Sequence, residues 1–192
     1  MKRYYIQLEE LDGLDAISFV ETPAIEAPAL CFSDAQRFEF SEEQMVVTGP
    51  ALIPDMPIYR NDPKLGEYEV VFKPEVIREL AIRYFRDNKQ NLFDLEHSTD
   101  ITSDDVTMFE SYFSDANKKF KNLPNGSWII SYKVNNQEVW NYIKQSPSSA
   151  GFSVEVRANL SEEPTNLVEE QTLEELIDEI LGYEPNQHGK EV

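Results

Sequence analysis

The sequence predicts an α+β fold that is mainly β, an antiparallel barrel or sheet with surrounding helices. Six or seven short runs are rich in β-branched and aromatic residues, which pack well on a pleated surface. Two segments in the body of the chain place apolar residues at helical spacing. The connections between these segments are too irregular for a doubly wound sheet, in which strands and helices alternate.

The first half of the chain leads from an arm to the clearest helix. Residues 1–40 mix apolar pieces with breakers and predict an N-terminal arm or a short edge strand. Strands follow at 45–48, which the turn-forming pair Gly49-Pro50 ends, and at 68–72. Segment 74–88 opens with a proline, which suits the first helical position, and its apolar residues recur every three or four positions. This spacing predicts an amphipathic helix.

The second half of the chain adds the strongest strand signals. Segment 91–97 alternates loosely and predicts a strand, while 106–113 and 128–134 do so more clearly. An asparagine precedes 137–145, whose apolar residues predict a short helix with a capped start. Segment 151–156 predicts a further strand.

Residues 41–160 form one predicted domain, and the character of the chain changes after it. Residues 161–192 carry ten acidic side chains against one basic side chain, Lys190. Within them, 172–181 has an apolar stripe, a threonine at its start and a glycine just beyond its end. These features predict an acidic amphipathic helix after a polar linker. We interpret 161–192 as a tail outside the domain.

Composition disfavours several classes of function. The 192 residues include 36 acidic and 17 basic side chains, a net charge of −19, whereas nucleic-acid binding needs Lys and Arg to neutralise phosphates. No apolar run approaches the roughly 18 residues of a membrane span, and the N-terminus lacks the apolar stretch of an export signal. The single cysteine, Cys31, allows no internal disulfide and is interpreted as a packed hydrophobe in a reducing cytosol. We therefore predict neither a nucleic-acid partner nor a membrane contact.

No motif for a metal or a cofactor is present. Two histidines, one cysteine and the lack of H-E-x-x-H leave a zinc site without its usual ligands. The seven glycines are scattered and form no phosphate-binding loop. We predict no metal and no cofactor.

Two residues could carry chemistry. His97 ends a strand-like segment among acidic side chains, which favour the protonated imidazole and can orient its ring; the alternative is a surface histidine. His188 lies in the polar C-terminal end and is interpreted as disordered. Ser153 follows a glycine in an apolar strand and is either a small tolerated residue or a nucleophile. A serine nucleophile needs a base, and His97 is the credible one.

An ordered series of segments carries a resemblance to a known family. The segments are DAISFVETPAIEAPAL (15–30), VVTGPALIPDMPIYR (46–60), LEHS around His97, MFESYF (108–113), LPNGSWIISYKVNNQEVWNYIK (123–144) and GFSVE (151–155). In this order, over about 15–155, the chain resembles the XkdF-like phage prohead proteases, which are related to herpesvirus assemblin.

The resemblance implies a fold and a site. It implies an assemblin-like closed antiparallel β-barrel with surrounding helices for 41–160, with Ser153 as nucleophile and His97 as base in acyl transfer. Phage members are expected to use an acidic third residue. Glu110, in MFESYF, sits in a family-like position and is our prediction. Glu155 is the alternative, because strand alternation points it to the same face as Ser153.

The resemblance also implies a role in head maturation. The chain is then a serine endopeptidase that cleaves capsid and scaffolding proteins, with the major capsid protein and the scaffolding protein as partners. It acts in the host cytoplasm inside the assembling prohead, and a homo-oligomer is compatible with this role. The alternative is a catalytically inactive scaffold or capsid-assembly protein that keeps the protease fold. An unrelated esterase is disfavoured because the G-x-S-x-G elbow is absent.

The acidic tail resembles a short scaffolding segment. Related phage proteases favour cutting after glutamate in Leu/Ile-x-Glu contexts, and three such triplets occur here: Leu167-Val168-Glu169, Leu173-Glu174-Glu175 and Ile177-Asp178-Glu179. One hypothesis is that the enzyme trims its own tail. The other is that any acidic leucine-rich helix contains such triplets by chance.

Overall fold

The computed structural model describes residues 1–20, 39–97, 99–102, 104–115, 120, 123–145 and 151–163. The interpretations of Cys31 and His188, the helix predicted at 172–181 and the three Leu/Ile-x-Glu triplets lie outside this part of the chain.

The described residues form twelve strands, two α-helices and one short 3-10 helix. The strands are β1 (Lys2–Gln7), β2 (Gly13–Val20), β3 (Glu39–Ser41), β4 (Val46–Leu52), β5 (Ile58–Asp62), β6 (Gly66–Val71), β7 (Phe93–Leu95), β8 (Thr99–Ile101), β9 (Val106–Phe113), β10 (Trp128–Val134), β11 (Gly151–Arg157) and β12 (Asn159–Ser161). The helices are α1 (Pro74–Arg86), η1 (Lys89–Asn91) and α2 (Gln137–Gln145). The prediction of a mainly β fold with two helices is confirmed. More strands form than expected, because β3, β8 and β12 have three residues each, too few to show a period, and because β1 and β2 lie in the predicted arm.

The strands pair into three four-stranded sheets rather than the expected closed barrel. The orders are β12-β1-β6-β5, β3-β4-β10-β9 and β11-β2-β7-β8. Pairing is mostly antiparallel, with parallel pairs β1–β6 and β2–β7. The predicted arm supplies β1 to one sheet and β2 to another, where β2 is an inner strand and not an edge strand. Because neighbouring strands are divided in this way, the described sheets keep open edges.

Strand β4 differs from its prediction in one informative way. Gly49-Pro50 was expected to end the strand, yet β4 continues through it to Leu52. The register with β10 shifts between Trp128 and Ile129, so that Ile129 lies opposite Pro50 and Trp128 opposite Leu52. A proline cannot donate to a sheet ladder and is tolerated at such an irregularity.

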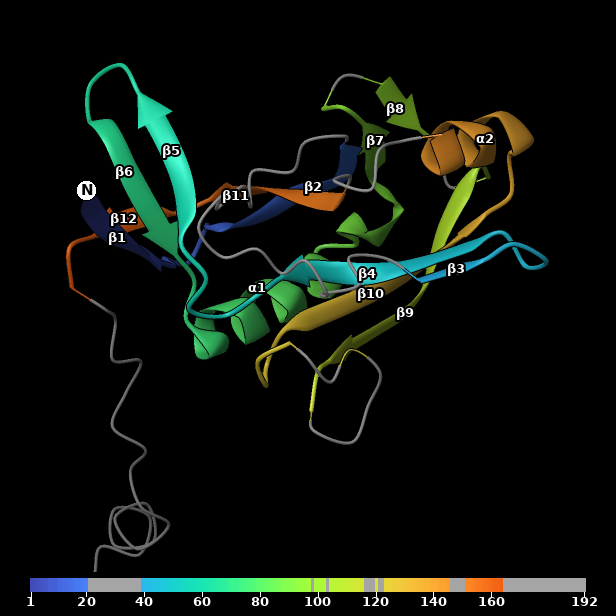
Figure 1. The fold of residues 1–192 in the computed structure, drawn as a ribbon. Coiled ribbons are helices and arrows are strands. Elements are labelled where there is room, and N and C mark those ends of the chain that lie inside the picture. Colours follow the sequence, from blue (N-terminus) through green and yellow to red (C-terminus); the bar gives the residue numbers. More distant parts are fainter. Residues whose placement is uncertain are drawn as a thin grey trace, which may run out of the picture.

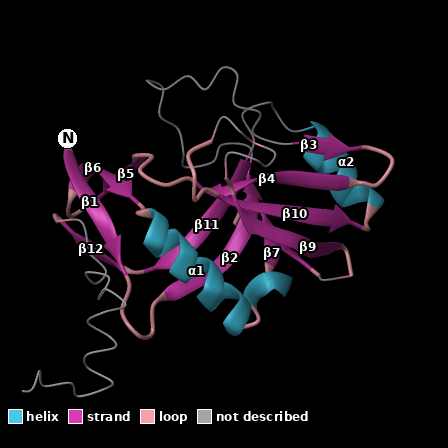
Figure 2. Ribbon diagram, turned by 90° about the horizontal axis from the view of Figure 1, so that it is seen from below, coloured by secondary structure: helices cyan, strands magenta, loops and turns pink. Residues whose placement is uncertain are grey.

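The sheet that contains β2 and β11 lies over the sheet that contains β4, β10 and β9 (Figure 1). Helix α1 packs against β2 and β10 and crosses the end of this arrangement in the view from below (Figure 2). Between the two layers, the Tyr132 ring lies 4.7 Å from that of Phe93 and 5.6 Å from that of Phe152. Phe152 is therefore a core residue, and strand alternation turns its neighbour Ser153 away from the core.

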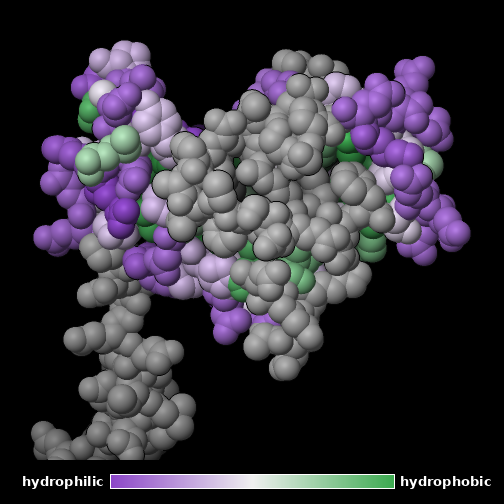
Figure 3. Space-filling model, in the orientation of Figure 1, coloured by the Kyte–Doolittle hydropathy of each residue, from purple (hydrophilic) through white to green (hydrophobic). Residues whose placement is uncertain are grey.

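Both helices agree with their sequence patterns. Helix α2 has the predicted bounds, and α1 starts at the predicted proline and buries one apolar face, Val76, Ile77, Leu80, Ala81 and Tyr84. Hydrophilic residues gather over the β5–β6 hairpin and over the α2 end of the molecule (Figure 3). Among the described helices, none has both the length and the apolar character to cross a membrane.

Candidate active site

His97 occupies a strained turn directly after β7. Glu96 and His97 have φ angles of 56° and 55°, in the left-handed region that residues other than glycine rarely adopt. The turn is tied to its surroundings twice: the Glu96 N–H donates to the Phe19 carbonyl at 3.0 Å, and the Tyr142 hydroxyl donates to the Glu96 carboxylate at 3.1 Å. Such strain persists only where neighbouring contacts impose it, and it is typical of functional sites.

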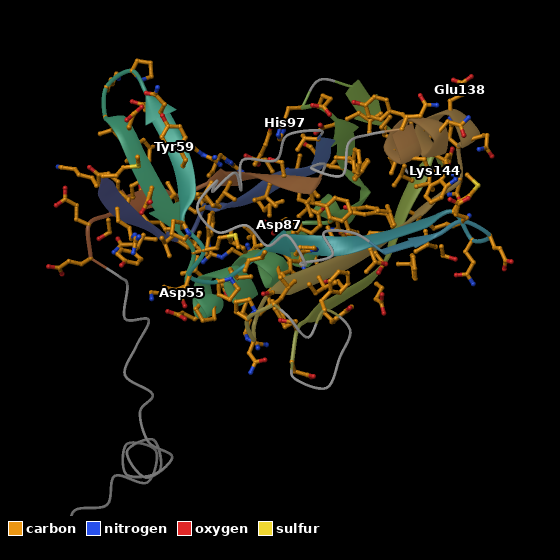
Figure 4. All side chains as sticks on the ribbon, in the orientation of Figure 1. Asp55, Tyr59, Asp87, His97, Glu138 and Lys144 are labelled. Atoms are coloured by element: carbon orange, nitrogen blue, oxygen red, sulfur yellow. The ribbon has the colours of Figure 1, made fainter. Side chains whose placement is uncertain are left out.

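The structure brings Ser153 to His97. Strand β11 pairs antiparallel with β2, and this pairing sets Ser153 opposite Ser18. His97 Nε2 lies 3.1 Å from Ser153 Oγ, within hydrogen-bond distance. His97 lies on the outer side of the β2–β11 layer (Figure 4), where the ring and the half-buried Ser153 are open to solvent on one side. A hydroxyl that contacts an imidazole in this way can pass its proton to the ring.

The other ring nitrogen of His97 has two partners. His97 Nδ1 lies 3.0 Å from Glu155 Oε1 and 2.9 Å from Ser18 Oγ. An ionised carboxylate can only accept, so the tautomer that donates toward Glu155 is the one with the imidazole hydrogen on Nδ1. The lone pair of Nε2 is then directed at the Ser153 hydroxyl, as a general base requires.

Glu110, our predicted third residue, was expected to contact His97, but it contacts a different side chain. It lies on β9 and its carboxylate accepts a 2.5 Å hydrogen bond from Ser131 Oγ, which is also 2.9 Å from Thr48 Oγ1. No hydrogen bond or ion pair joins Glu110 to His97 in the part of the chain that the structure describes. The reason is topological: β9 pairs with β10 in one sheet, whereas β7 and β11 belong to another. The alternative, Glu155, is the carboxylate that contacts the ring.

A cavity of about 230 Å³ opens beside Ser153. Its walls are mostly apolar and come from β4, β5, β6 and β11, with Leu52, Ile58, Val70 and Phe152 among them. Arg60 also lines the cavity; its partial burial lowers the pKa of the guanidinium. No carboxylate of the described chain forms an ion pair with it. A cavity of this kind suits a side chain with an apolar stem and an acidic end.

Ser18 is the site residue that sequence reasoning missed. It sits in an apolar run of β2, far from His97 in the chain, and nothing in its local pattern distinguishes it from a packed serine. Only the pairing of β2 with both β7 and β11 reveals it. Among the described residues, no group of three or more His, Cys, Asp or Glu side chains is arranged to hold a metal ion.

A serine within hydrogen-bond distance of one imidazole nitrogen, with a carboxylate 3.0 Å from the other, defines a site of the serine hydrolase class. The family model described as "Putative phage serine protease XkdF" matches residues 37–162, a span that includes His97, Ser153 and Glu155. The chain belongs to this phage serine protease family. Neither the curated proteins nor the solved structures contain a match to the chain.

Proposed function

We propose that this chain is a prohead serine endopeptidase in which Ser153 is the nucleophile, His97 the base and Glu155 the acidic third residue. The observation that carries the proposal is the position of one imidazole between two partners. Its Nε2 lies 3.1 Å from Ser153 Oγ, and its Nδ1 lies 3.0 Å from Glu155 Oε1. Membership of a phage serine protease family supports it independently.

The proposed reaction is acyl transfer. Ser153 Oγ attacks the scissile carbonyl carbon while His97 Nε2 takes the hydroxyl proton, and the Glu155 carboxylate stabilises the imidazolium that forms. The imidazolium then gives its proton to the leaving amine, and the peptide bond breaks to leave an ester on Ser153. Water attacks this ester, with His97 again as base, and the second product is released as a carboxylate.

The cavity beside Ser153 supports cleavage after an acidic residue. The apolar walls would contact the methylene groups of a glutamate, and Arg60 would receive its carboxylate. This agrees with the preference for Leu/Ile-x-Glu contexts among related phage proteases. Under this proposal the substrates are capsid and scaffolding proteins, and the three triplets of the chain's own tail are candidate self-cleavage sites.

The proposed setting is the assembling prohead in the host cytoplasm, where the enzyme would meet the major capsid protein and the scaffolding protein. A relationship to herpesvirus assemblin belongs to the same proposal. It rests on the segments quoted above and is compatible with a mainly β fold that carries two helices.

Co-expression with the major capsid protein tests the function. The full chain should shorten the capsid protein, with new C-termini after glutamate in mass spectra, and Ser153→Ala and His97→Ala should not. Ser131→Ala is the matched control, because Ser131 is a buried serine on another sheet. Processing by both site variants at the wild-type rate would reject the protease, and head assembly without any processing would favour the inactive scaffold.

The same samples test self-cleavage. The intact mass of the wild-type chain should decrease through loss of tail residues, and the mass of Ser153→Ala should not. A full-length wild-type chain, or equal loss from both chains, would rule out self-trimming.

A further inference from the structure

Ser18 has a position that the serine protease chemistry does not by itself require. It is on β2, the strand between the one that carries Ser153 and the one that leads to His97. Ser18 lies opposite Ser153 on one side and Asp94 on the other. Its side chain is fully buried, with 0% of its surface exposed, and its Oγ is 2.9 Å from His97 Nδ1. The imidazole is thus held between two serines of adjacent strands.

We propose that Ser18 is a positioning residue that fixes the orientation of the His97 ring, while Glu155 supplies the charge. This inference rests on the proposed function, in which His97 is the base. Its evidence is the position of the Ser18 side chain. Ser18 has one rotatable side-chain bond and sits on an inner strand, so its oxygen has a fixed place.

Glu155 is poorly suited to fix the ring by itself. Its side chain is 51% exposed, and that of His97 is 36% exposed, so solvent and salt screen their attraction. The glutamate also has a longer side chain, with more rotatable bonds to immobilise than a serine. The carboxylate therefore selects which nitrogen carries hydrogen, and the buried hydroxyl determines where that nitrogen lies.

The turn makes such an anchor necessary. His97 follows Glu96 in a left-handed turn that the intrinsic preferences of the backbone do not favour. Its backbone is tied to β2 through Glu96, one residue earlier, and Ser18 ties its ring to the same strand. If Ser18 accepts from Nδ1–H, both contacts to this nitrogen favour the tautomer in which Nε2 is free to act as base.

Enzyme kinetics separate the two roles. Ser18→Ala should lower kcat about tenfold, with little change in KM, on a peptide taken from the capsid cleavage site, since one hydrogen bond to the base is lost. Glu155, the carboxylate that contacts the ring, is unchanged in this variant. Glu155→Gln keeps the Ser18 hydroxyl and should lower kcat by a larger factor, because the imidazolium loses its negative partner.

Two further variants make the kinetic result specific. Ser18→Thr keeps a hydroxyl and should recover most of the lost rate. Ser131→Ala removes an equally buried serine from β10 and should leave kcat unchanged. If Ser18→Ala fails to fold, Ser18→Cys replaces the hydroxyl by a weak hydrogen-bonding group of similar size and is measured in the same way.

Nitrogen-15 NMR of the imidazole provides a measurement that does not depend on activity. The chain has two histidines, so His188→Asn leaves the His97 signals alone in the spectrum. At a pH where the ring is neutral, wild type should show mainly the Nδ1–H tautomer, and Ser18→Ala should show a smaller fraction of it. Ser131→Ala should match wild type.

These results distinguish the two proposals. A tautomer shift in Ser18→Ala together with an inactive wild type would keep the positioning role and reject the protease. An active wild type whose rate and NMR spectrum are the same with Ser18→Ala would reject the positioning role and keep the protease. A fluorophosphonate label attached to Ser18 in place of Ser153 would also overturn the inference, because Ser18 would then be the nucleophile.

Discussion

Two sheets of this molecule carry similar rows of polar side chains, and only one row has the parts of a catalytic site. The first row comprises Ser18 on β2, with Ser153 and Glu155 on β11. The second comprises Thr48 on β4, Ser131 on β10 and Glu110 on β9, which lie side by side in the register of their sheet. The side chains of the second row hydrogen-bond to one another, because Ser131 contacts both Thr48 and Glu110.

The difference between the rows is the histidine. A carboxylate is too weak a base at neutral pH to activate a serine, whereas an imidazole titrates near neutrality. The turn after β7 presents His97 to the first row, and no such turn approaches the second among the described residues. A serine beside a glutamate is therefore a structural feature here, and a serine beside an imidazole that a glutamate orients is a candidate nucleophile.

The largest expected effect is the loss of either member of the dyad. Ser153→Ala and His97→Ala should each lower kcat for peptide cleavage by about 10³- to 10⁶-fold, because nucleophile and base act as a unit. The double variant should be little worse than either single variant. Single-turnover assays with the capsid-derived peptide measure this, and additive losses would contradict the predicted pair.

The next effect tests the two glutamates against each other. Glu155→Gln should reduce kcat about 10- to 100-fold, because the imidazolium loses the charge that stabilises it. Glu110→Gln, the matched change in the second row, should stay within about twofold of wild type, since it only alters a hydrogen bond to Ser131. The reverse order of effects would restore Glu110 as the third residue.

The aromatic core that joins the two sheets should respond to alkaline pH. Burial raises the pKa of Tyr84 to about 12 and raises that of Tyr132 well above its ordinary value. An unfolded tyrosine titrates near pH 10, so the contribution of these two tyrosines to the free energy of unfolding should be constant below that pH and fall between about pH 10 and 12. Tyr84→Phe should lose about 2 kcal/mol less over this window than wild type, as urea unfolding would measure. An identical decline in both chains would contradict this cause.

The smallest effect concerns the second row. Ser131→Ala removes a buried hydroxyl with two hydrogen bonds and should lower the free energy of unfolding by about 1–2 kcal/mol. Peptide cleavage should be unchanged. Chemical denaturation and a rate measurement on the same sample test both parts, and a large loss of activity would show that the second row affects the site.

Local pattern alone determined several features of this protein. The helices predicted at 74–88 and 137–145 follow from apolar spacing with a proline or an asparagine at the start, although the first one ends at Arg86. The strands at 106–113 and 128–134 follow from their β-branched and aromatic residues. The dyad of His97 and Ser153 was predicted from residue type and family resemblance; the structure brings the two side chains into contact, and their catalytic roles stay a prediction. These features are local, or are carried by short motifs, so they are visible in the sequence.

Strand pairing determined the features that the sequence did not predict. Sequence reasoning placed β2 in an arm, expected a closed barrel, missed Ser18 and preferred Glu110 to Glu155. Each of these depends on which strands lie side by side, and neighbours such as Ser18 and Ser153 are separated by most of the chain. The free energy that selects such partners comes from burial between layers and from sheet registers formed over long separations. For that reason the sequence could indicate a candidate base and a candidate nucleophile, and only the tertiary structure showed which carboxylate and which second serine lie beside the imidazole.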